Sequence, residues 1–239
     1  DICLSACLLS VRLPADDRTL VFEQRGPLLL VSVSCGPQPP WQLHRELALV
    51  HEQILSLLTR DGIACVFTHR RGFNLRHLLS GAESVLDRLL SGTTANRRLL
   101  LGALQAMLLP SVLRRALSAT LCRAAMASVP ALVLALVAIG RHLVMVARQR
   151  ALAEGGELSA SDIHLVLNLL KVGSGEVWSP VCLPRFNPDG FFYAYAAALD
   201  EGPGGGGSSA VTLILLLTEL EERQAELQAL WQQQQVADL

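Results

Sequence analysis

Apolar residues recur at helical spacing in one long segment of the first half of the chain. Between Trp41 and Arg60 they alternate in steps of four and three, at Leu43, Leu47, Val50, Ile54 and Leu57. Residues at this spacing share one face of an α-helix, so the segment predicts an amphipathic helix that packs on a sheet. Prolines at positions 37, 39 and 40 pre-set its start, and Asp61–Gly62 is expected to end it.

Strand patterns precede this helix and a second helical pattern follows it. Residues 19–23 and 28–34 flank a turn signal at Arg25–Gly26 and predict a β-hairpin, after an apolar run at 6–13. After the helix, basic residues 68–72 predict a loop, and Asn74 is placed to cap a helix that extends to Leu89. The polar stretch 91–98 resembles a linker, and we place a module boundary between it and Pro110.

The second half alternates strands and helices more completely. A helical segment from Ser111 to about Ala125 comes first, Ser159 and Asp162 stand at capping-box spacing before another helix, and a last helix starts near Glu219. Extended apolar segments predict five strands, at 129–139, 142–148, 177–185, 191–199 and 211–218. The resulting order, ββαβββα, predicts an α+β fold in which helices flank an antiparallel sheet.

The stretch PVCLPRFNPDGFFYAY, residues 180–195, combines prolines, a cysteine, an arginine and aromatic residues. Its segment Asn187-Pro188-Asp189-Gly190 is a strong turn signal, because proline fixes φ at the second position and glycine frees the fourth. Pro180 and Pro184 have no N–H to donate, so the first arm is expected at a sheet edge or with a bulge. The stretch therefore predicts a hairpin with an irregular first arm.

Composition and charge mainly exclude certain classes of protein and of partner. The chain has 239 residues, 51% of them hydrophobic and 17% charged, which indicates a well-packed globular protein. A formal net charge of −1 provides no global attraction to nucleic acid, so no such partner is expected.

The apolar run Val129–Gly140 is shorter than the about 20 residues of a membrane span and predicts a buried strand. No secretory signal is visible, and six cysteines without CxxC spacing predict reduced cytosolic thiols.

Few residues carry candidate chemistry. Cys182 would act as a nucleophile only with a base in reach and a lowered pKa, and packing within a strand is the favoured interpretation. His44 and His51 lie on one side of the long helix, but no third ligand is near them in sequence, so surface histidines are favoured over a metal site. The glycine-rich residues 202–209 lack the GK[ST] ending of a phosphate loop. We expect no catalytic, cofactor-binding or metal-binding residues.

One compact basic cluster stands out, formed by His69, Arg70, Arg71, Arg76 and His77. A solvated loop and helix start is one interpretation. The other is a surface for an anionic lipid headgroup or an acidic partner. Near the C-terminus, residues 218–235 place apolar side chains on one side over about two heptads, which favours a helix packed on the sheet over a coiled coil.

The stretch at 180–195 resembles the Mon/SAND family of vacuolar fusion proteins. In that family a tryptophan-containing strand runs into a CLP[RK]FN segment and then an aromatic strand. The matching positions are Glu176, Trp178, Pro180, Cys182, Leu183, Pro184, Arg185, Phe186, Asn187, Gly190, Phe191 and Tyr193. Less specific matches, such as RGPLLLVSVS from Arg25 and DIHLVLNLL from Asp162, extend the similarity from about Val11 to Thr218.

The resemblance implies tandem longin domains. We place the C-terminal part of a first, incomplete domain at 1–98, a connecting helical segment at 99–126 and a second domain at 127–239. Family members pair with a Ccz-type longin protein, and the heterodimer is a guanine-nucleotide exchange factor for a late-endosomal Rab GTPase. The resemblance thus implies a cytoplasmic protein, peripheral on late endosome and vacuole membranes that carry phosphoinositides. Its roles would be vesicle-mediated protein transport, endosome maturation and vacuole fusion.

The chain also departs from the family pattern. It starts inside the first longin domain and stops before the family's third, so it is interpreted as a fragment, and no GTPase-contacting residue is carried over. The motif residues Trp178, Cys182–Asn187 and Gly190 are expected to be structural or to form a partner surface. A longin-type trafficking adaptor or scaffold without exchange activity is the alternative function. A thiol hydrolase that uses Cys182 is a more distant one.

Overall fold

The computed structural model describes residues 8–13, 18–70, 72–95, 97–123, 129, 131–148, 158–170, 176–199 and 211–218. The chain forms two compact units. Unit 1 comprises Asp1–Leu104, Gly156–Lys171 and Cys182–Gly190, and unit 2 comprises Gln105–Gly155, Val172–Val181 and Phe191–Leu239. Each unit combines antiparallel strands with helices, which confirms the α+β class. The domain bounds drawn from the sequence stay a prediction.

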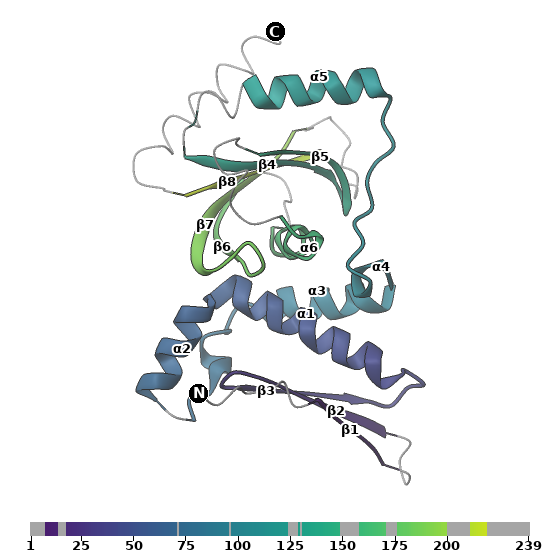
Figure 1. Ribbon diagram of the computed structural model, residues 1–239, viewed down its shortest axis with the longest axis vertical. Helices are drawn as coiled ribbons and strands as arrows, with labels where there is room; N and C mark the ends of the chain where they lie inside the picture. The colour runs from purple at the N-terminus through teal and green to yellow at the C-terminus, as the bar shows by residue number, and fades with distance from the viewer. Residues whose placement is uncertain are drawn as a thin grey trace. The chain divides into compact units, whose positions relative to one another are not determined.

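Unit 1 contains a three-stranded antiparallel sheet of order β1-β2-β3, made of β1 (Leu8–Leu13), β2 (Arg18–Arg25) and β3 (Leu28–Ser34). The predicted hairpin is confirmed, with Arg25 paired to Leu28 and Gly26 at a positive φ of 57°. Helix α1 (Pro40–Leu58) crosses one face of this sheet (Figure 1), where its Leu43 and Leu47 pack on Val21.

Helix α1 is buried on more than its sheet-facing side. Leu49 packs with Leu89, Leu99 and Leu100 of the helices that follow. Gln53 is fully buried and donates from Nε2 to Ser56 Oγ at 2.6 Å. Because this amide and this hydroxyl are hydrogen-bonded to each other, they can be buried at little cost. Helix α1 thus has buried side chains on more than one face and lies at the centre of unit 1.

The predicted end of the long helix at Asp61–Gly62 is wrong. α1 ends before Thr59, whose φ of 60° interrupts the helix, and α2 (Arg60–His69) begins immediately. The Thr59 hydroxyl accepts a hydrogen bond from the Gly62 N–H at 3.1 Å and so caps α2. Part of the predicted basic loop is therefore helical.

The predicted helix from Asn74 to Leu89 is divided. Asn74 does act as a cap, since its Oδ1 accepts from the Arg76 N–H at 3.1 Å, but the element is a short 3₁₀ helix, η1 (Leu75–His77). Gly81, with a φ of 90°, separates η1 from α3 (Glu83–Ala95). α4 (Arg97–Leu100) follows.

The interpretation of residues 91–98 as a linker is also wrong, because α3 continues through most of them. The hydroxyls of Thr93 and Thr94 donate to the carbonyls of Leu90 and Ser91 at 2.7 and 2.8 Å. These bonds satisfy polar side chains within the helix, so a polar composition is compatible with helical structure here.

Helix α6 (Ala160–Leu169) also belongs to unit 1, where it contacts α1 and α3. Ser159 is its N-cap, as predicted, and accepts from the Ser161 N–H at 3.2 Å. Leu167 of the predicted apolar face is only half-buried. Asn168 is buried instead and donates to Gln53 Oε1 at 2.9 Å and to the Val85 carbonyl at 3.0 Å.

Unit 2 is built on a five-stranded sheet of order β5-β4-β8-β7-β6. Its strands are β4 (Leu132–Ile139), β5 (His142–Arg148), β6 (Glu176–Leu183), β7 (Asn187–Ala198) and β8 (Val211–Leu217). The end of β6 and the start of β7, within residues 182–190, belong to unit 1. β4 is buried almost throughout, which confirms the buried strand predicted from its apolar run. Helix α5 (Ser111–Leu121) lies against this sheet (Figure 1), with Leu117 and Leu121 packed near Val137 and Met145. Within the described residues, no helix is long and apolar enough to cross a bilayer.

The hairpin at 180–195 is confirmed, and β6 is an edge strand, as Pro180 and Pro184 predicted. Its turn is misplaced by the sequence, however, because residues 184–186 form the turn and β7 already begins at Asn187. The Phe186 N–H donates to the Leu183 carbonyl at 3.1 Å and closes this earlier turn. The predicted glycine-rich loop and C-terminal helix lie outside the described residues.

Candidate functional site

The motif that carries the family resemblance forms the end of the β6–β7 hairpin, here called the CLPRFN hairpin (residues 182–190). Cys182 and Leu183 are buried, and the Cys182 thiol donates to the Asn187 carbonyl at 3.2 Å. Burial, together with the negative charges of Asp162 and Asp189, raises the pKa of the Cys182 thiol to about 12. A thiol with this pKa stays protonated at neutral pH, whereas a nucleophile needs the thiolate.

Arg185 is the most connected residue of the motif. Its side chain donates to Glu52 Oε1 on α1, from Nε at 3.0 Å and from Nη2 at 2.6 Å. Its backbone N–H donates to Asp162 Oδ1 on α6 at 3.2 Å. Pro184 and Phe186 lie on either side of it in the turn. Arg185 thus ties the hairpin to two helices.

The remaining motif residues shape the hairpin. Asn187 Oδ1 accepts from the Asp189 N–H at 3.3 Å, and a Cβ atom at Gly190 would lie 3.0 Å from the Asn187 amide nitrogen. Glycine therefore leaves room for the Asn187 side chain. In unit 2, Trp178 lies beside the buried Tyr195 with ring centroids 4.8 Å apart. These contacts support a structural role for the motif.

Sequence reasoning missed the two carboxylates at this site. Asp162 is fully buried, and instead of completing a capping box its side chain receives the Arg185 N–H. Glu52 comes from the middle of α1, far away in sequence. The sequence shows Asp162 as a polar position within the apolar pattern of α6. It does not show which residue Asp162 contacts, because Arg185 approaches it only in the folded chain.

A second ion pair holds the same hairpin at the surface. Arg60 of α2 donates to both carboxylate oxygens of Asp189, at 2.7 and 2.5 Å. The two side chains are 62% and 37% exposed, so solvent screens much of their attraction. This pair provides a natural comparison for the more buried Arg185–Glu52 contact.

The basic cluster predicted at residues 69–77 is exposed where it is described. Arg70 follows α2 and Arg76 lies in η1, both exposed, whereas Arg71 lies outside the described residues. His77 packs edge-on to Phe73, with ring centroids 6.4 Å apart. These positions are compatible with a solvated surface and with a surface for anions, so the predicted lipid or partner role stays a prediction.

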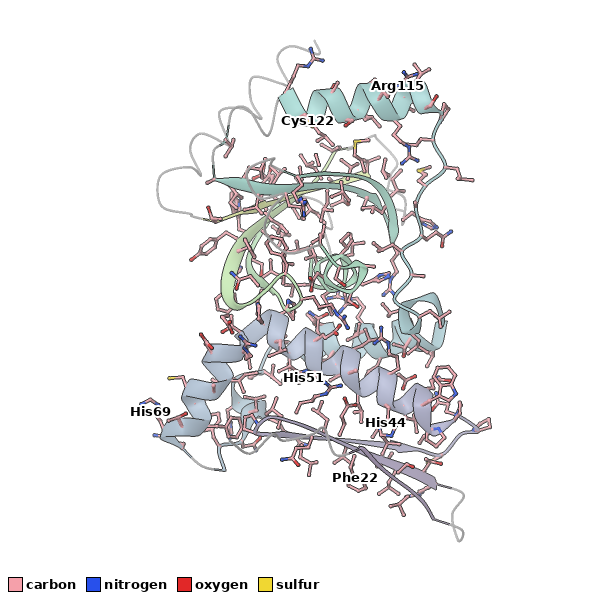
Figure 2. All side chains as sticks on the ribbon, in the orientation of Figure 1. Phe22, His44, His51, His69, Arg115 and Cys122 are labelled. Carbon is pink, nitrogen blue, oxygen red and sulfur yellow. The ribbon has the colours of Figure 1, made fainter. Side chains whose placement is uncertain are left out.

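His44 and His51 are half-buried, so their interpretation as surface histidines is wrong. Both lie between α1 and the sheet, whereas Phe22 lies on the opposite face of that sheet (Figure 2). Burial and the nearby Arg25 lower the pKa of His51, against the opposing effect of Glu23. Across the described part of the chain, no three potential metal-ligating side chains come together.

The face of the three-stranded sheet that points away from α1 is apolar and open to solvent. Leu29, Val31 and Val33 of β3 are 63%, 47% and 57% exposed. Val31 pairs with Phe22 of β2, which lies on the same outer face (Figure 2). We call this set, with Val11 of β1, the outer apolar face. A contiguous exposed apolar surface of this kind typically marks a protein-binding site.

A second basic surface, missed by the sequence analysis, lies on α5. Its arginines are exposed, and Arg115 projects away from the sheet (Figure 2). Val112 on the same helix is 71% exposed. The signal was present in the sequence, because no acidic residue occurs between Asp87 and Glu154.

One open cavity of about 480 Å³ lies in unit 1 between the start of α1 and the α3–α4 region. Pro37, Pro39, Trp41, Leu100 and Leu101 provide most of its apolar lining. Its polar lining is provided by Gln38, Gln42, Thr93 and Thr94, and both threonine hydroxyls donate to helix carbonyls.

Comparison with known proteins identifies both halves of the chain. Residues 7–89 match the first longin domain of FUZ, MON1 and HPS1, and residues 130–234 match the second longin domain of the same proteins. Tandem longin domains, predicted from the resemblance, are thereby confirmed.

The similarity to individual relatives extends across both domains. The chain is 47% identical to the mouse vacuolar fusion protein MON1 homolog B over 193 residues. This alignment covers 79% of this chain and 34% of the relative. It is 35% identical to chicken MON1 homolog A over 191 residues, which cover 78% of this chain and 34% of the relative. It is also 35% identical to pufferfish (Takifugu rubripes) protein SAND over 190 residues, which cover 78% of this chain and 35% of the relative. The chain thus spans about a third of the length of these relatives. From its two longin domains and these identities, the chain belongs to the MON1/SAND family of vacuolar fusion proteins.

Proposed function

We propose that this chain is a subunit of a heterodimeric guanine-nucleotide exchange factor complex for a late-endosomal or vacuolar Rab GTPase. Its partner would be a Ccz-type longin protein, and its role would lie in endosome maturation and vacuole fusion. The observation that carries the proposal is the match of both longin domains to the MON1/SAND family. The names of the relatives place those proteins in vacuolar fusion.

Exchange of this kind requires surfaces rather than reactive side chains. A partner surface opens the nucleotide site of the GTPase, and no covalent bond is made or broken. Cys182 is buried and protonated, which agrees with a structural role for the motif. The proposal therefore assigns no catalytic residue to this chain.

The outer apolar face is the surface that we assign to the longin partner. It presents aliphatic side chains over neighbouring strands, and burial of such side chains is the main driving force of stable association. The arginines of α5 and the basic cluster at Arg70 and Arg76 suit an anionic membrane, for instance one that carries phosphoinositides. A peripheral location on late endosome or vacuole membranes follows from the proposal.

Co-expression with a Ccz-type longin protein, followed by nucleotide-release measurements, tests the proposal. We expect the two chains to co-purify and the complex to accelerate release of fluorescent GDP from one member of a Rab panel, which neither chain does alone. A stable complex that accelerates release from no Rab protein would favour the trafficking adaptor. Failure to form a complex would contradict both the pairing and the exchange function.

A further inference from the structure

The β6–β7 turn (residues 184–186) is attached to two helices through Arg185. The Arg185 guanidinium donates to Glu52 Oε1 on α1 at 3.0 and 2.6 Å, and the Arg185 N–H donates to Asp162 Oδ1 on α6 at 3.2 Å. Arg185 thus meets one carboxylate from each of two helices, and all three residues lie within unit 1.

The charges at this contact do not balance. Asp162 is 0% exposed and the Glu52 side chain 14% exposed. The Arg185 side chain is 46% exposed, whereas both carboxylates are largely buried. Two carboxylates with one guanidinium leave an excess negative charge beside these buried groups, which is unfavourable. In addition, Glu52 Oε2 and Asp162 Oδ2 are both buried without a hydrogen-bond partner in the described structure. One added proton would neutralise the excess charge.

We propose that Glu52, Asp162 and Arg185 form a proton-dependent latch, in which protonation of Asp162 tightens the attachment of the β6–β7 turn to α1 and α6. Asp162 is the more buried of the two carboxylates, so it holds the proton. Asp162 Oδ1 keeps the Arg185 N–H as donor, while Glu52 remains ionised and paired with the guanidinium. The latch goes beyond the proposed exchange function and does not depend on it.

The electrostatics of Asp162 support this direction. The pKa of Asp162 is raised to about 6, chiefly by burial and also by the charge of Glu52 on α1, against the opposing effects of the Arg185 N–H and charge. From β6, the thiol of Cys182 is the other titratable group near it. Helix α3, which also contacts α6, carries Glu83, Asp87 and Arg88, and these groups do not contribute to the shift.

The sign of the pH dependence follows from this shift. The latched state holds a proton more tightly than an open state in which Asp162 has its ordinary pKa of 3.8. Protonation of Asp162 therefore stabilises the latched state. This stabilisation is complete below about pH 4 and is lost as the pH rises through about 6. For a shift of this size, the equilibrium between latched and open states changes about tenfold between pH 5 and pH 7.5.

Hydrogen exchange of the full chain, analysed for the peptide 182–190 and corrected for intrinsic rates, measures this equilibrium. We expect about tenfold greater protection at pH 5 than at pH 7.5 in the native chain. In Asp162→Asn the amide keeps an acceptor for the Arg185 N–H without the charge, so protection should be high and independent of pH. In Arg185→Gln two carboxylates lose their counter-charge, so protection should fall at pH 7.5 and recover on acidification.

Asp189→Asn is the matched control, because it removes the other ion pair of the same hairpin and leaves the latch intact. It should retain the tenfold pH response. An unchanged pH response in Asp162→Asn would overturn the latch. Should that variant fail to fold, NMR titration of the Asp162 carboxyl carbon in the native chain decides the question, since a midpoint below about pH 4.5 contradicts the latch.

Discussion

At the scale of single residues, the surroundings of a side chain decide its chemistry. Cys182 is the residue type of a nucleophile, yet it is buried, donates to a carbonyl and has a pKa raised to about 12. The sequence could indicate packing as the better interpretation, because the cysteine stands in an apolar strand. The sequence could not reveal Asp162 or Glu52 beside the motif, since these residues come from distant helices.

Thiol labelling tests the surroundings of Cys182 directly. At pH 8 we expect iodoacetamide to modify the exposed Cys35, Cys65 and Cys122 rapidly in the native chain, and Cys182 at least about a hundredfold more slowly than Cys65. The reason is that both burial and the raised pKa suppress the thiolate. Peptide mass spectrometry over time gives the rates, and labelling in denaturant is the control in which all four should react. Comparable native rates for Cys65 and Cys182 would refute this account.

At the scale of elements, periodic patterns predicted the strands and helices, whereas local junctions were misplaced. The β2–β3 hairpin and the strands β4 and β5 agree with the sequence analysis, since apolar extended segments on either side of a glycine turn define them. The division of the long helix at Thr59 was not predictable, because threonine rarely adopts a positive φ. The sequence offered Asp61–Gly62 as the more ordinary helix end, but Gly62 instead donates to the cap of α2.

The α1–α2 junction gives a prediction for stability. Thr59 has φ 60° and ψ 161°, a region that glycine adopts without strain. Thr59→Gly should therefore raise the free energy of unfolding by about 1 kcal/mol, because relief of strain exceeds the small loss from replacing a threonine cap with glycine. Thr59→Val keeps the strain and removes the hydroxyl that accepts from Gly62, so it should lower stability by about 1 kcal/mol. Urea denaturation of the three chains gives the order, and a less stable glycine variant would be the contrary result.

At the scale of the whole molecule, contacts do not follow the order of the chain. Residues 156–171 and 182–190 come from the second half of the sequence but belong to unit 1. Polar contacts link them to the first half, as in the buried hydrogen bond from Asn168 to Gln53 and the partly exposed ion pair of Arg185 with Glu52. Periodicity predicts which face of an element is buried but not which distant element covers it. For that reason the sequence predicted the longin-like elements but not the partners of the CLPRFN hairpin.

The outer apolar face provides the last prediction, which rests on the proposed pairing with a longin partner. Val31 is half-exposed at 47%, so Val31→Lys should change the free energy of unfolding by less than about 1 kcal/mol. In a complex, the same lysine would be buried without a partner, which is costly, and the affinity should fall at least tenfold. Val31→Thr, a β-branched and uncharged control, should keep most of the affinity because it preserves the strand and adds no charge. Titration of the purified chain with the longin partner measures the loss, and equal affinity of the lysine and threonine variants would show that the partner binds elsewhere.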